Sequence, residues 1–453
     1  MKEYDVVVIG AGDVGLGIVF SALSDNRSVA LVEKENVGGT CVNVGCVPSK
    51  TLIFAADRVM EIREAEKLGI KADIREVDFV SVMKRMREAV DFGRNSIKEA
   101  LESSGNLDFY HSEGRFVDDY TLETGGTRIR GQKIFIASGT RPFVPPVRGL
   151  AELRYLTNES LLKLEKKPES IIIVGGGYIG VEYAHFFEAM GSKVAVVERG
   201  PAVVFHEEPE ISELLAKKMR ERMEVFTDTE VVEVRGEKGG YTVIVRSDER
   251  RTEELRGEEI LVAVGRRSNA DLLDVGKTGV QTDKANFIKV NDYLETDREN
   301  IWALGDAIGR QMFTHVGDRE AEVAWYNATN GEKVKMDFTN VPHAVFTHPQ
   351  IASVGLTEAA ARREYTVLVG KAKYSDTVKG TAMVEKDGFA KAVVERETGR
   401  ILGFHIIGPH APILIQEVVN AMAHENDISY ITGCMHIFPA LSDLITETLG
   451  NVE

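Results

Sequence analysis

The chain has 453 residues, of which 43% are hydrophobic and 28% are charged. A single hydrophobic core rarely serves a chain of this length, so roughly two to four domains are expected. The formal net charge of −16, without any run of Lys or Arg, argues against a nucleic-acid partner, because phosphate backbones attract basic surfaces. Residues 1–4 lead directly into a strand pattern, so we expect no signal peptide, no membrane span and a cytoplasmic location.

The chain opens with a pattern typical of a dinucleotide-binding β-α-β unit. Residues 5–9 and 29–33 predict buried parallel strands on either side of a helix. The turn after the first strand contains Gly10, Gly12 and Gly15. Glycines there permit a tight turn and a close approach of the backbone to a pyrophosphate. Glu33 ends the second strand, where a carboxylate accepts hydrogen bonds from a ribose hydroxyl, so the whole pattern predicts a bound dinucleotide.

Two cysteines follow this unit in the run 39–50, Gly-Thr-Cys-Val-Asn-Val-Gly-Cys-Val-Pro-Ser-Lys. Cys41 and Cys46 are five positions apart, and the third cysteine, Cys434, lies almost the whole chain away. Zinc ligation would need two more soft ligands nearby, so no metal site is expected. Buried core cysteines are the ordinary alternative, but the surrounding glycines, proline and lysine indicate a backbone bend beside a cofactor. We therefore interpret the pair as a cycling disulfide.

The β-α-β pattern then recurs. Residues 170–174 and 193–198 predict the two strands, with a helix to Met190 between them. The second turn carries Gly175, Gly177, Tyr178 and Gly180. In both copies the first glycine and the terminal acid are 23 positions apart, from 10 to 33 and from 175 to 198. Two such units and a dithiol favour a flavin on one and a nicotinamide on the other. Glu198 favours NADH by repelling a 2′-phosphate, while the adjacent Arg199 leaves NADPH possible.

Three short segments, residues 134–142, 261–267 and 301–306, each contain a predicted strand that ends in small residues and glycine. At these separations they predict a nucleotide domain that is interrupted by a second one and then resumes. Asp306 is placed to hold a ribityl hydroxyl of the flavin. The expected cofactor contacts in these segments are Ser138, Gly139, Gly305 and Asp306 for the flavin and Gly265 for the nicotinamide dinucleotide.

Over nearly its full length the chain resembles the FAD-dependent pyridine nucleotide-disulfide oxidoreductases, the family of dihydrolipoamide dehydrogenase, glutathione reductase, mycothione reductase and mercuric reductase. The run 39–50 resembles the redox-disulfide motif of the dihydrolipoamide dehydrogenase and mercuric reductase branch, and 345–358 resembles the opening of its dimerisation domain. The resemblance implies an α/β fold with two Rossmann-like dinucleotide-binding domains, the second inserted in the first, and a C-terminal α+β dimerisation domain. It also implies a homodimer.

The implied boundaries are 1–150 for the FAD-binding domain, 151–270 for the NAD(P)-binding domain, 271–337 for the return of the chain to the FAD domain and 338–453 for the interface domain. The last segment has its own signals. Residues 389–394 and 401–407 predict strands joined by a turn at 397–399, and a helical pattern follows at 413–423.

The resemblance implies that a hydride passes from the nicotinamide to FAD and then, as an electron pair, to the disulfide. Cys46 would face the flavin and Cys41 would attack the substrate. Lys50 would lie near the flavin and pair with Glu182, and Thr40 is counted among the flavin contacts. Lys50 and the helix N-terminus would both stabilise a thiolate, which is the reactive form of cysteine.

The C-terminal segment departs from the family pattern. Disulfide-reducing members carry a His-Pro pair followed by a carboxylate, and the His, reaching across the dimer, manages protons for the substrate-facing thiol. Here Phe438 occupies the His position and Asp443 that of the acid. His436 is two residues upstream, about 6 to 7 Å away in an extended segment. Because losing a general base typically costs about 10²- to 10⁴-fold, lipoamide is expected to be a poor substrate.

A Phe-Pro pair resembles mercuric reductases, although their vicinal C-terminal cysteines are absent from this chain, which ends Leu-Gly-Asn-Val-Glu. The expected acceptor is therefore a small disulfide or a thiol-bound metal ion. The alternatives are an NADH oxidase, diaphorase or quinone reductase that acts directly at the flavin, and a redox-sensing flavoprotein without enzymatic activity. A redox-sensing flavoprotein without enzymatic activity would leave the second dinucleotide-binding unit unexplained.

Overall fold

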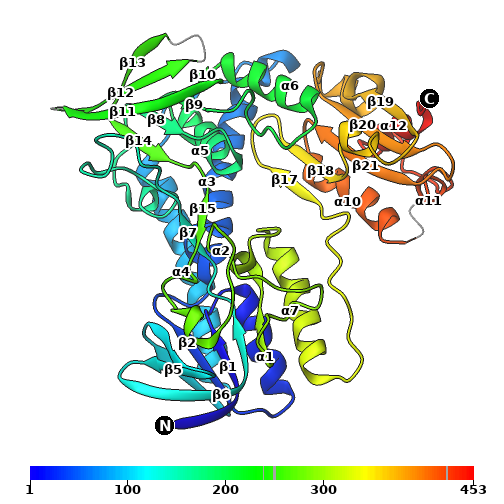
Figure 1. Cartoon of the computed structure of the whole chain (residues 1–453). Helices are drawn as coiled ribbons and strands as arrows, with labels where there is room; N and C mark the ends of the chain where they lie inside the picture. The colour runs from blue at the N-terminus through cyan, green and yellow to red at the C-terminus, as the bar shows by residue number, and fades with distance from the viewer. Residues whose placement is uncertain (238, 248–250, 425–426) are drawn as a thin grey trace. The chain divides into compact units, whose positions relative to one another are not determined.

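The structure is a computed structural model that describes residues 1–237, 239–247, 251–424 and 427–453 (Figure 1). The described residues divide into two compact units, each assembled from separate stretches of chain. The first unit comprises Met1–Thr51, Met83–Phe143 and Gly265–Phe338. The second comprises Leu52–Val82, Val144–Val264 and Thr339–Glu453. Helices α3 (Cys46–Arg63) and α4 (Phe79–Glu102) cross the boundaries between these stretches, so each contributes residues to both units.

The first unit is built on a sheet with the strand order β3-β2-β1-β6-β5-β4, to which β16 is added beside β6. Strand β1 pairs in parallel with β2 and with β6, as its continuous β-branched sequence predicts for a strand buried on both faces. The strands are β1 (Lys2–Ile9), β2 (Val29–Glu33), β3 (Leu107–His111), β4 (Gly114–Asp118), β5 (Thr121–Thr124), β6 (Thr127–Ile136) and β16 (Ile301–Ala303). A separate ribbon joins β7 (Thr140–Pro142) to β15 (Arg266–Ser268).

The glycine turn at the carboxyl end of β1 leads into the first helix of this unit. Helix α1 (Asp13–Ser24) follows the first glycine turn and packs against α7 (Thr314–Thr329), as Figure 1 shows. Val6–Ile9 of β1 and Ile18, Val19 and Ala22 of α1 are buried, so the helix covers the sheet through its apolar side. The remaining elements are α2 (Gly39–Val44) and the short 3₁₀ helices η3 (Val275–Thr278) and η4 (Gly305–Ile308).

In the second unit, a parallel sheet has the strand order β10-β9-β8-β14. Its strands are β8 (Ser170–Val174), β9 (Lys193–Val197), β10 (Glu224–Phe226) and β14 (Glu259–Val262), and its helices are α5 (Tyr178–Ala189) and α6 (Pro209–Arg220). Residues Gly180–Phe187 of α5 are buried without interruption, because the helix packs on the sheet and is itself covered. An antiparallel sheet of β11 (Thr229–Glu237), β12 (Gly240–Ser247) and β13 (Thr252–Gly257) follows β10 in the chain. The 3₁₀ helices η1 (Ala65–Leu68) and η2 (Leu161–Lys163) also belong to this unit.

The C-terminal part of the second unit is an antiparallel sheet with the strand order β17-β18-β21-β20-β19. The predicted strands at 389–394 and 401–407 are confirmed as β20 and β21, and the predicted helix is α10. One apolar core joins the sheet to its helices, with Phe404 and Tyr374 fully buried within it. The elements are β17 (His343–Val345), β18 (Ile351–Gly355), α8 (Glu358–Ala361), β19 (Val367–Lys373), η5 (Tyr374–Asp376), α9 (Val378–Ala382), β20 (Phe389–Glu395), β21 (Ile401–Ile407), α10 (Ala411–Met422), α11 (Ser429–Thr432) and α12 (Asp443–Gly450).

Within the described ranges, we find no helix whose length and apolar character would let it cross a lipid bilayer.

Candidate active site

The first glycine turn requires glycine at two of its three glycine positions. Gly10 has a positive φ of 104°, and a Cβ at this position would lie 2.3 Å from the Ala137 carbonyl oxygen. A Cβ on Gly15 would lie 1.9 Å from the Gly10 carbonyl oxygen, so neither glycine is replaceable without moving backbone. A Cβ on Gly12 would have only an ordinary contact, 3.6 Å from the Gly39 Cα atom. Gly12 therefore keeps side-chain atoms away from the start of α1, where a helix N-terminus attracts an anion.

The acid at the end of the second strand holds the glycine turn in both β-α-β units. Glu33 accepts a hydrogen bond from the Ala11 backbone N–H at 2.9 Å through one oxygen and one from Glu35 at 2.7 Å through the other. Glu198 likewise accepts from the backbone N–H groups of Gly176 and Gly200, both at 2.6 Å. The two acids are thus structural supports of the turns as well as predicted ribose contacts.

Several expected flavin contacts lie in the first unit in an arrangement that fits a polar cofactor. The Ser138 hydroxyl is buried and has no hydrogen-bond partner among the described residues, and the Cβ position of Gly139 faces open space. Asp306, in η4 directly after Gly305, accepts a hydrogen bond from the Thr140 hydroxyl at 2.9 Å. An unpartnered buried hydroxyl beside open space is costly unless a ligand satisfies it. Sequence reasoning assigned no role to Thr140, whose hydroxyl group links residues 134–142 to residues 301–306.

The two cysteines lie at the junction of α2 and α3. Cys41 is in α2, directly after the half-buried Thr40, and Cys46 is the first residue of α3. Cys41 is half-buried and Cys46 is exposed, and both are free thiols in this structure. The Cys46 sulfur lies 3.6 Å from the hydroxyl oxygen of Thr314, the first residue of α7. Thr314 was missed by sequence reasoning because no local signal marks it.

The two thiols differ in their acidity. A hydrogen bond from Cys41, supported by the Thr314 hydroxyl and the Lys50 charge, lowers the pKa of Cys46 to about 6. The hydrogen bond to Cys46, together with burial and the negative charge on that sulfur, raises the pKa of Cys41. At neutral pH the pair therefore carries one charge, on Cys46, and one proton, on Cys41.

The second glycine turn repeats the first in the second unit. Gly175 has a φ of 113°, and a Cβ on Gly180 would lie 2.0 Å from the Gly175 carbonyl oxygen, whereas Gly177 faces open space. The hydroxyl of Tyr178 donates to the buried Glu207 at 3.2 Å. Gly265, also expected at this site, lies in the first unit, so its contact with a nicotinamide dinucleotide stays a prediction.

Lys50 and Glu182 belong to different units, and their expected pairing stays a prediction. Glu182 is buried in α5 with 6% of its surface exposed, and it accepts a hydrogen bond from the Phe346 backbone N–H at 3.0 Å. A buried carboxylate needs such partners, because desolvation of the charged form is otherwise unfavourable.

Comparison with known proteins decides the family. Residues 4–321 match the model of the pyridine nucleotide-disulphide oxidoreductases, and residues 341–449 match the dimerisation domain of the same enzymes. The chain belongs to this pyridine nucleotide-disulphide oxidoreductase family. Its members are enzymes that use flavin and NAD(P)H, which confirms the expected fold class and enzyme class. The matched dimerisation domain indicates a homodimer.

Relatives in this oxidoreductase family include enzymes with different acceptors. The chain is 34% identical to a mycothione reductase of Mycobacterium tuberculosis, over 99% of both chains. It is 33% identical to a mercuric reductase of Lysinibacillus sphaericus, over 99% of this chain and 80% of the relative, and 33% identical to a dihydrolipoyl dehydrogenase of Synechocystis, over 98% of each. The Cu(II) complex of the HOCl-induced flavoprotein disulfide reductase RclA from Escherichia coli has a TM-score of 0.90 at 27% identity, covering 99% of each chain.

In the C-terminal segment of this oxidoreductase, the ring of Phe438 occupies the position at which the family pattern has a histidine. Phe438 is 72% exposed, and Asp443 begins α12, where it accepts a hydrogen bond from the Ala440 backbone N–H at 3.3 Å. The nearby His436 is engaged by groups of its own chain. Its Nε2 lies 2.6 Å from a carboxylate oxygen of Glu417 and its Nδ1 lies 3.1 Å from the Cys434 carbonyl oxygen, so both ring nitrogens already face acceptors.

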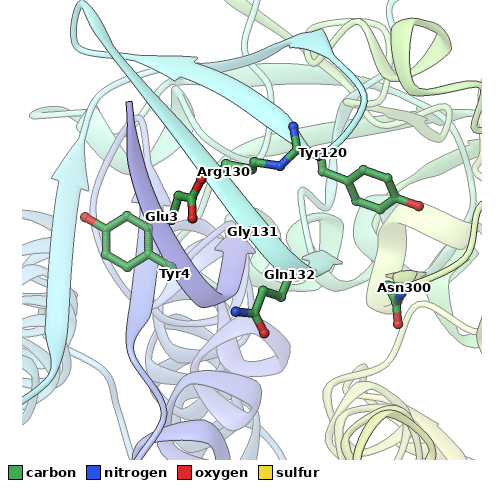
Figure 2. A pocket seen from close by; sticks show the side chains of 7 residues that line it. All are labelled: Glu3, Tyr4, Tyr120, Arg130, Gly131, Gln132 and Asn300. Atoms are coloured by element: carbon green, nitrogen blue, oxygen red, sulfur yellow. The ribbon is translucent and has the colours of Figure 1, made fainter.

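A hollow of about 340 Å³ lies elsewhere in the first unit. Figure 2 shows its lining: Glu3, Tyr4, Tyr120, Arg130, Gly131, Gln132 and Asn300. Glu3 and Tyr4 belong to the first half of β1 and pair with Arg130 and Gly131 of β6, whereas the glycine turn follows the other end of β1. Dinucleotides bind at the carboxyl ends of such strands, so this hollow is not the flavin site. Among the described residues, no cluster of three or more His, Cys, Asp or Glu side chains is arranged to hold a metal ion.

Proposed function

We propose that this enzyme passes two electrons from NADH through FAD and the Cys41–Cys46 pair to a disulfide or to a thiol-bound metal ion. The observation that carries the proposal is the placement of Cys41 and Cys46 at the junction of α2 and α3, with the Cys46 sulfur 3.6 Å from the Thr314 hydroxyl oxygen. These surroundings lower the pKa of Cys46 and raise that of Cys41. Bound FAD would supply hydride acceptance and electron transfer to sulfur. A thiolate that is stable at neutral pH is the form in which sulfur exchanges electrons or binds metal.

The residues proposed to hold FAD are Gly10, Gly12, Gly15, Glu33, Thr40, Lys50, Ser138, Gly139, Gly305 and Asp306. Their role is supported by the open space beside Gly139 and by the buried, unpartnered Ser138 hydroxyl in the described part of the chain. We also propose the domain boundaries 1–150, 151–270, 271–337 and 338–453. A cytoplasmic location is proposed because a cycling dithiol needs a reducing compartment.

NADH is proposed to bind at the second glycine turn, through Gly175, Gly177, Tyr178, Gly180, Glu198 and Gly265. The carboxylate of Glu198, engaged with the backbone of the turn at 2.6 Å, is fixed at the end of β9, where it would accept from a free 2′-hydroxyl and repel a 2′-phosphate. Arg199 is exposed beside it, which keeps NADPH as a slower donor.

The acceptor is proposed to need sulfur ligands more than a proton donor from the C-terminal segment. Phe438 is exposed and has no group that transfers protons, while both nitrogens of His436 are engaged. A thiophilic metal ion meets this condition. The similarity to a mercuric reductase and to the Cu(II) complex of RclA supports this choice.

The test is an anaerobic NADH titration followed by an acceptor screen with oxidised lipoamide, mercuric ion, Cu(II) and a quinone. A long-wavelength thiolate-to-flavin absorption band at two-electron reduction, followed by reduction of a metal ion or disulfide, is expected. Cys41→Ser should abolish both of these activities. If Cys41→Ser retains them, or if only the quinone is reduced, the dithiol route is refuted and the enzyme acts directly at the flavin.

A further inference from the structure

A row of four polar side chains crosses the C-terminal sheet of the second unit. Each stands directly opposite the next in the strand register, in the order His343, Ser353, His405 and Lys391 on β17, β18, β21 and β20. Residues directly opposite one another in a sheet point to the same face. His343 is partly buried, and the other three are 2% exposed. Buried polar groups in such a row need partners from whatever covers this face of the sheet.

The partners are two consecutive acids, Glu207 and Glu208, which directly precede α6. One carboxylate oxygen of Glu207 lies 2.7 Å from Nε2 of His343, and the other accepts a hydrogen bond from the Ser353 hydroxyl at 2.6 Å. Glu208 accepts from the Lys391 ammonium group at 2.9 Å. Both acids are buried, with at most 4% of their surface exposed. The two acids therefore fasten the second β-α-β unit to the row of polar side chains on the sheet.

Glu207 also contacts the second glycine turn. Tyr178, the first residue of α5, donates from its hydroxyl at 3.2 Å to the Glu207 oxygen that faces His343. The rings of Tyr178 and His343 are stacked, with their centroids 5.8 Å apart and their planes 26° from parallel. The backbone N–H of Val204, three residues before Glu207, donates to the Gly176 carbonyl oxygen at 2.9 Å. One carboxylate thus joins the glycine turn to the C-terminal sheet.

The protonation states suit this arrangement. An ionised carboxylate only accepts hydrogen bonds, so Tyr178, His343 and Ser353 are the donors. Burial alone would raise the pKa of Glu207, but the hydrogen bonds and charge from His343, with the Ser353 hydroxyl, hold that pKa below its ordinary value. Burial and the neighbouring Glu207 charge raise the pKa of Tyr178, so its hydroxyl keeps its proton. The Tyr178 hydroxyl therefore stays a donor to a charged acceptor, which makes a strong hydrogen bond.

Attachment of the β-α-β unit to the sheet does not by itself account for the contact with Tyr178. Glu207 and Glu208 already make that attachment through His343, Ser353 and Lys391. Tyr178 instead belongs to the glycine turn and directly follows Gly177, whose Cβ position faces open space. A side chain that is already fixed in one position spares a bound ligand the entropic cost of ordering it.

We propose that Glu207 is a positioning residue for NADH. Through the Tyr178 hydroxyl it fixes the Tyr178 ring against His343 and so preorganises the second glycine turn for the dinucleotide. The inference rests on the proposed function, which places NADH at this turn, and it gives the dimerisation domain a part in cofactor binding. The contact is the same before and during the reaction, so its loss raises KM for NADH and leaves kcat nearly unchanged.

The decisive experiment measures the binding of NAD⁺ to the oxidised holoenzyme by calorimetry, because neither partner can pass electrons to the other. Tyr178→Phe removes the hydroxyl but keeps the ring, and Glu207→Ala removes the acceptor. Each is expected to weaken NAD⁺ binding about five-fold, and the double variant no further, because both changes break the same contact. Glu207→Gln keeps one acceptor oxygen and should recover part of the loss. Unchanged or tighter binding in Tyr178→Phe, or single effects that multiply in the double variant, would overturn the proposal.

Glu208→Ala is the matched control. Glu208 is as deeply buried as Glu207 and joins the same two parts of the unit through Lys391, but no contact of Glu208 with Tyr178 is among the described interactions. Glu207→Ala and Glu208→Ala should both lower Tm, because each leaves buried polar groups unpaired. Only Glu207→Ala should weaken NAD⁺ binding. Equal weakening in both variants would show that the acids act only by attaching the domains, and it would refute the positioning role.

Steady-state kinetics provide the second measurement. With the best acceptor of the screen above, Tyr178→Phe should raise KM for NADH about five-fold and change kcat by less than about two-fold. A fall in kcat without a rise in KM contradicts the proposal. A parent enzyme that binds NAD⁺ but reduces none of the acceptors refutes the proposed function alone, whereas a parent that binds neither NAD⁺ nor NADP⁺ overturns both.

Discussion

The hydroxyl oxygen of Thr314 lies 3.6 Å from the sulfur of Cys46, although 268 positions separate these residues in the chain. A hydroxyl group at this distance donates to a thiolate and stabilises it, and the same contact contributes to the lowered pKa of Cys46. The relationship places the start of α7 within the redox site. It also provides a direct way to change the charge on the dithiol without altering either cysteine.

Thr314→Val should raise the pKa of Cys46 above its value of about 6. Less Cys46 would then be ionised at neutral pH, so its alkylation by iodoacetamide and the thiolate-to-flavin absorption band should both weaken. The pH dependence of the band in reduced enzyme measures the shift. Thr329→Val, at the other end of the same helix, is the control. A titration that stays centred near pH 6 in Thr314→Val would show that this hydroxyl does not act on Cys46.

Gly12→Val should yield folded protein without stoichiometric flavin. A Cβ at Gly12 has only an ordinary contact with the backbone, so the turn still forms, but the added side chain fills the space where the pyrophosphate approaches. The flavin-to-protein absorbance ratio and the circular dichroism spectrum test both parts. Gly105→Val, at a position with no neighbouring atom within 4 Å of the Cβ, should keep its flavin. Full flavin content in Gly12→Val would place the cofactor elsewhere.

Glu198→Gln should narrow the preference for NADH over NADPH by about ten-fold, or 1.4 kcal/mol. Glutamine keeps an oxygen that can accept from the Gly176 backbone while removing the charge that repels a 2′-phosphate. Glu198→Ala should also narrow the preference for NADH, but it should lower kcat/KM for both donors, because it removes a side chain that supports the turn. The ratio of kcat/KM for the two donors is the measurement. A parent enzyme that prefers NADPH would contradict the assignment and direct attention to Arg199.

Phe438→His should raise turnover with lipoamide by about ten-fold or more, because it restores an imidazole where the family pattern has one. The exposed ring position can accept the change without a cavity, and Asp443 follows in the same segment. Reduction of a metal ion should stay the same or fall. Ile437→His, at the neighbouring position that is 82% exposed, should have no such effect. A parent enzyme that already reduces lipoamide near the typical enzyme value of about 10 s⁻¹ would show that no base is missing.

Glu320 should make the first unit less stable as the pH rises. Its side chain is fully buried in α7, and burial raises its pKa to about 7. A carboxyl group with a raised folded-state pKa contributes stability that is complete below its unfolded pKa, near 4.3. That contribution is lost as the pH rises through about 7, and the loss amounts to about 4 kcal/mol above that pH.

Thermal unfolding at about pH 5 and about pH 8 tests this prediction. Glu320→Gln, which keeps an acceptor for the Gly305 backbone N–H, should remove most of the difference in Tm between the two conditions. Glu322→Gln is the control, because Glu322 lies two residues further along α7 with its side chain 66% exposed. Equal pH dependence in the parent and in Glu320→Gln would refute the assignment.

The sequence alone was enough to predict the strands and helix starts whose residue pattern is local. Buried β-branched runs predicted β1, β2, β8 and β9, and the glycine turns predicted the starts of α1 and α5. These signals are strong because strand burial and turn geometry each restrict residue type at fixed spacing. The Cys41–Cys46 motif is equally local, whereas the family was predicted from a resemblance, which the family comparison confirms.

The motif itself led us to expect Lys50 near the two sulfurs, but only the tertiary structure brings Thr314 there. Thr314 begins α7, 268 positions from Cys46 in the chain, and no period or spacing relates it to the motif. The support of the glycine turns by Glu33 and Glu198 was also invisible in the sequence, where both read as ribose contacts. Local patterns report how a segment buries its own apolar residues. The charge carried by a thiol depends instead on polar groups within a few ångströms, and folding brings these together from distant parts of the chain.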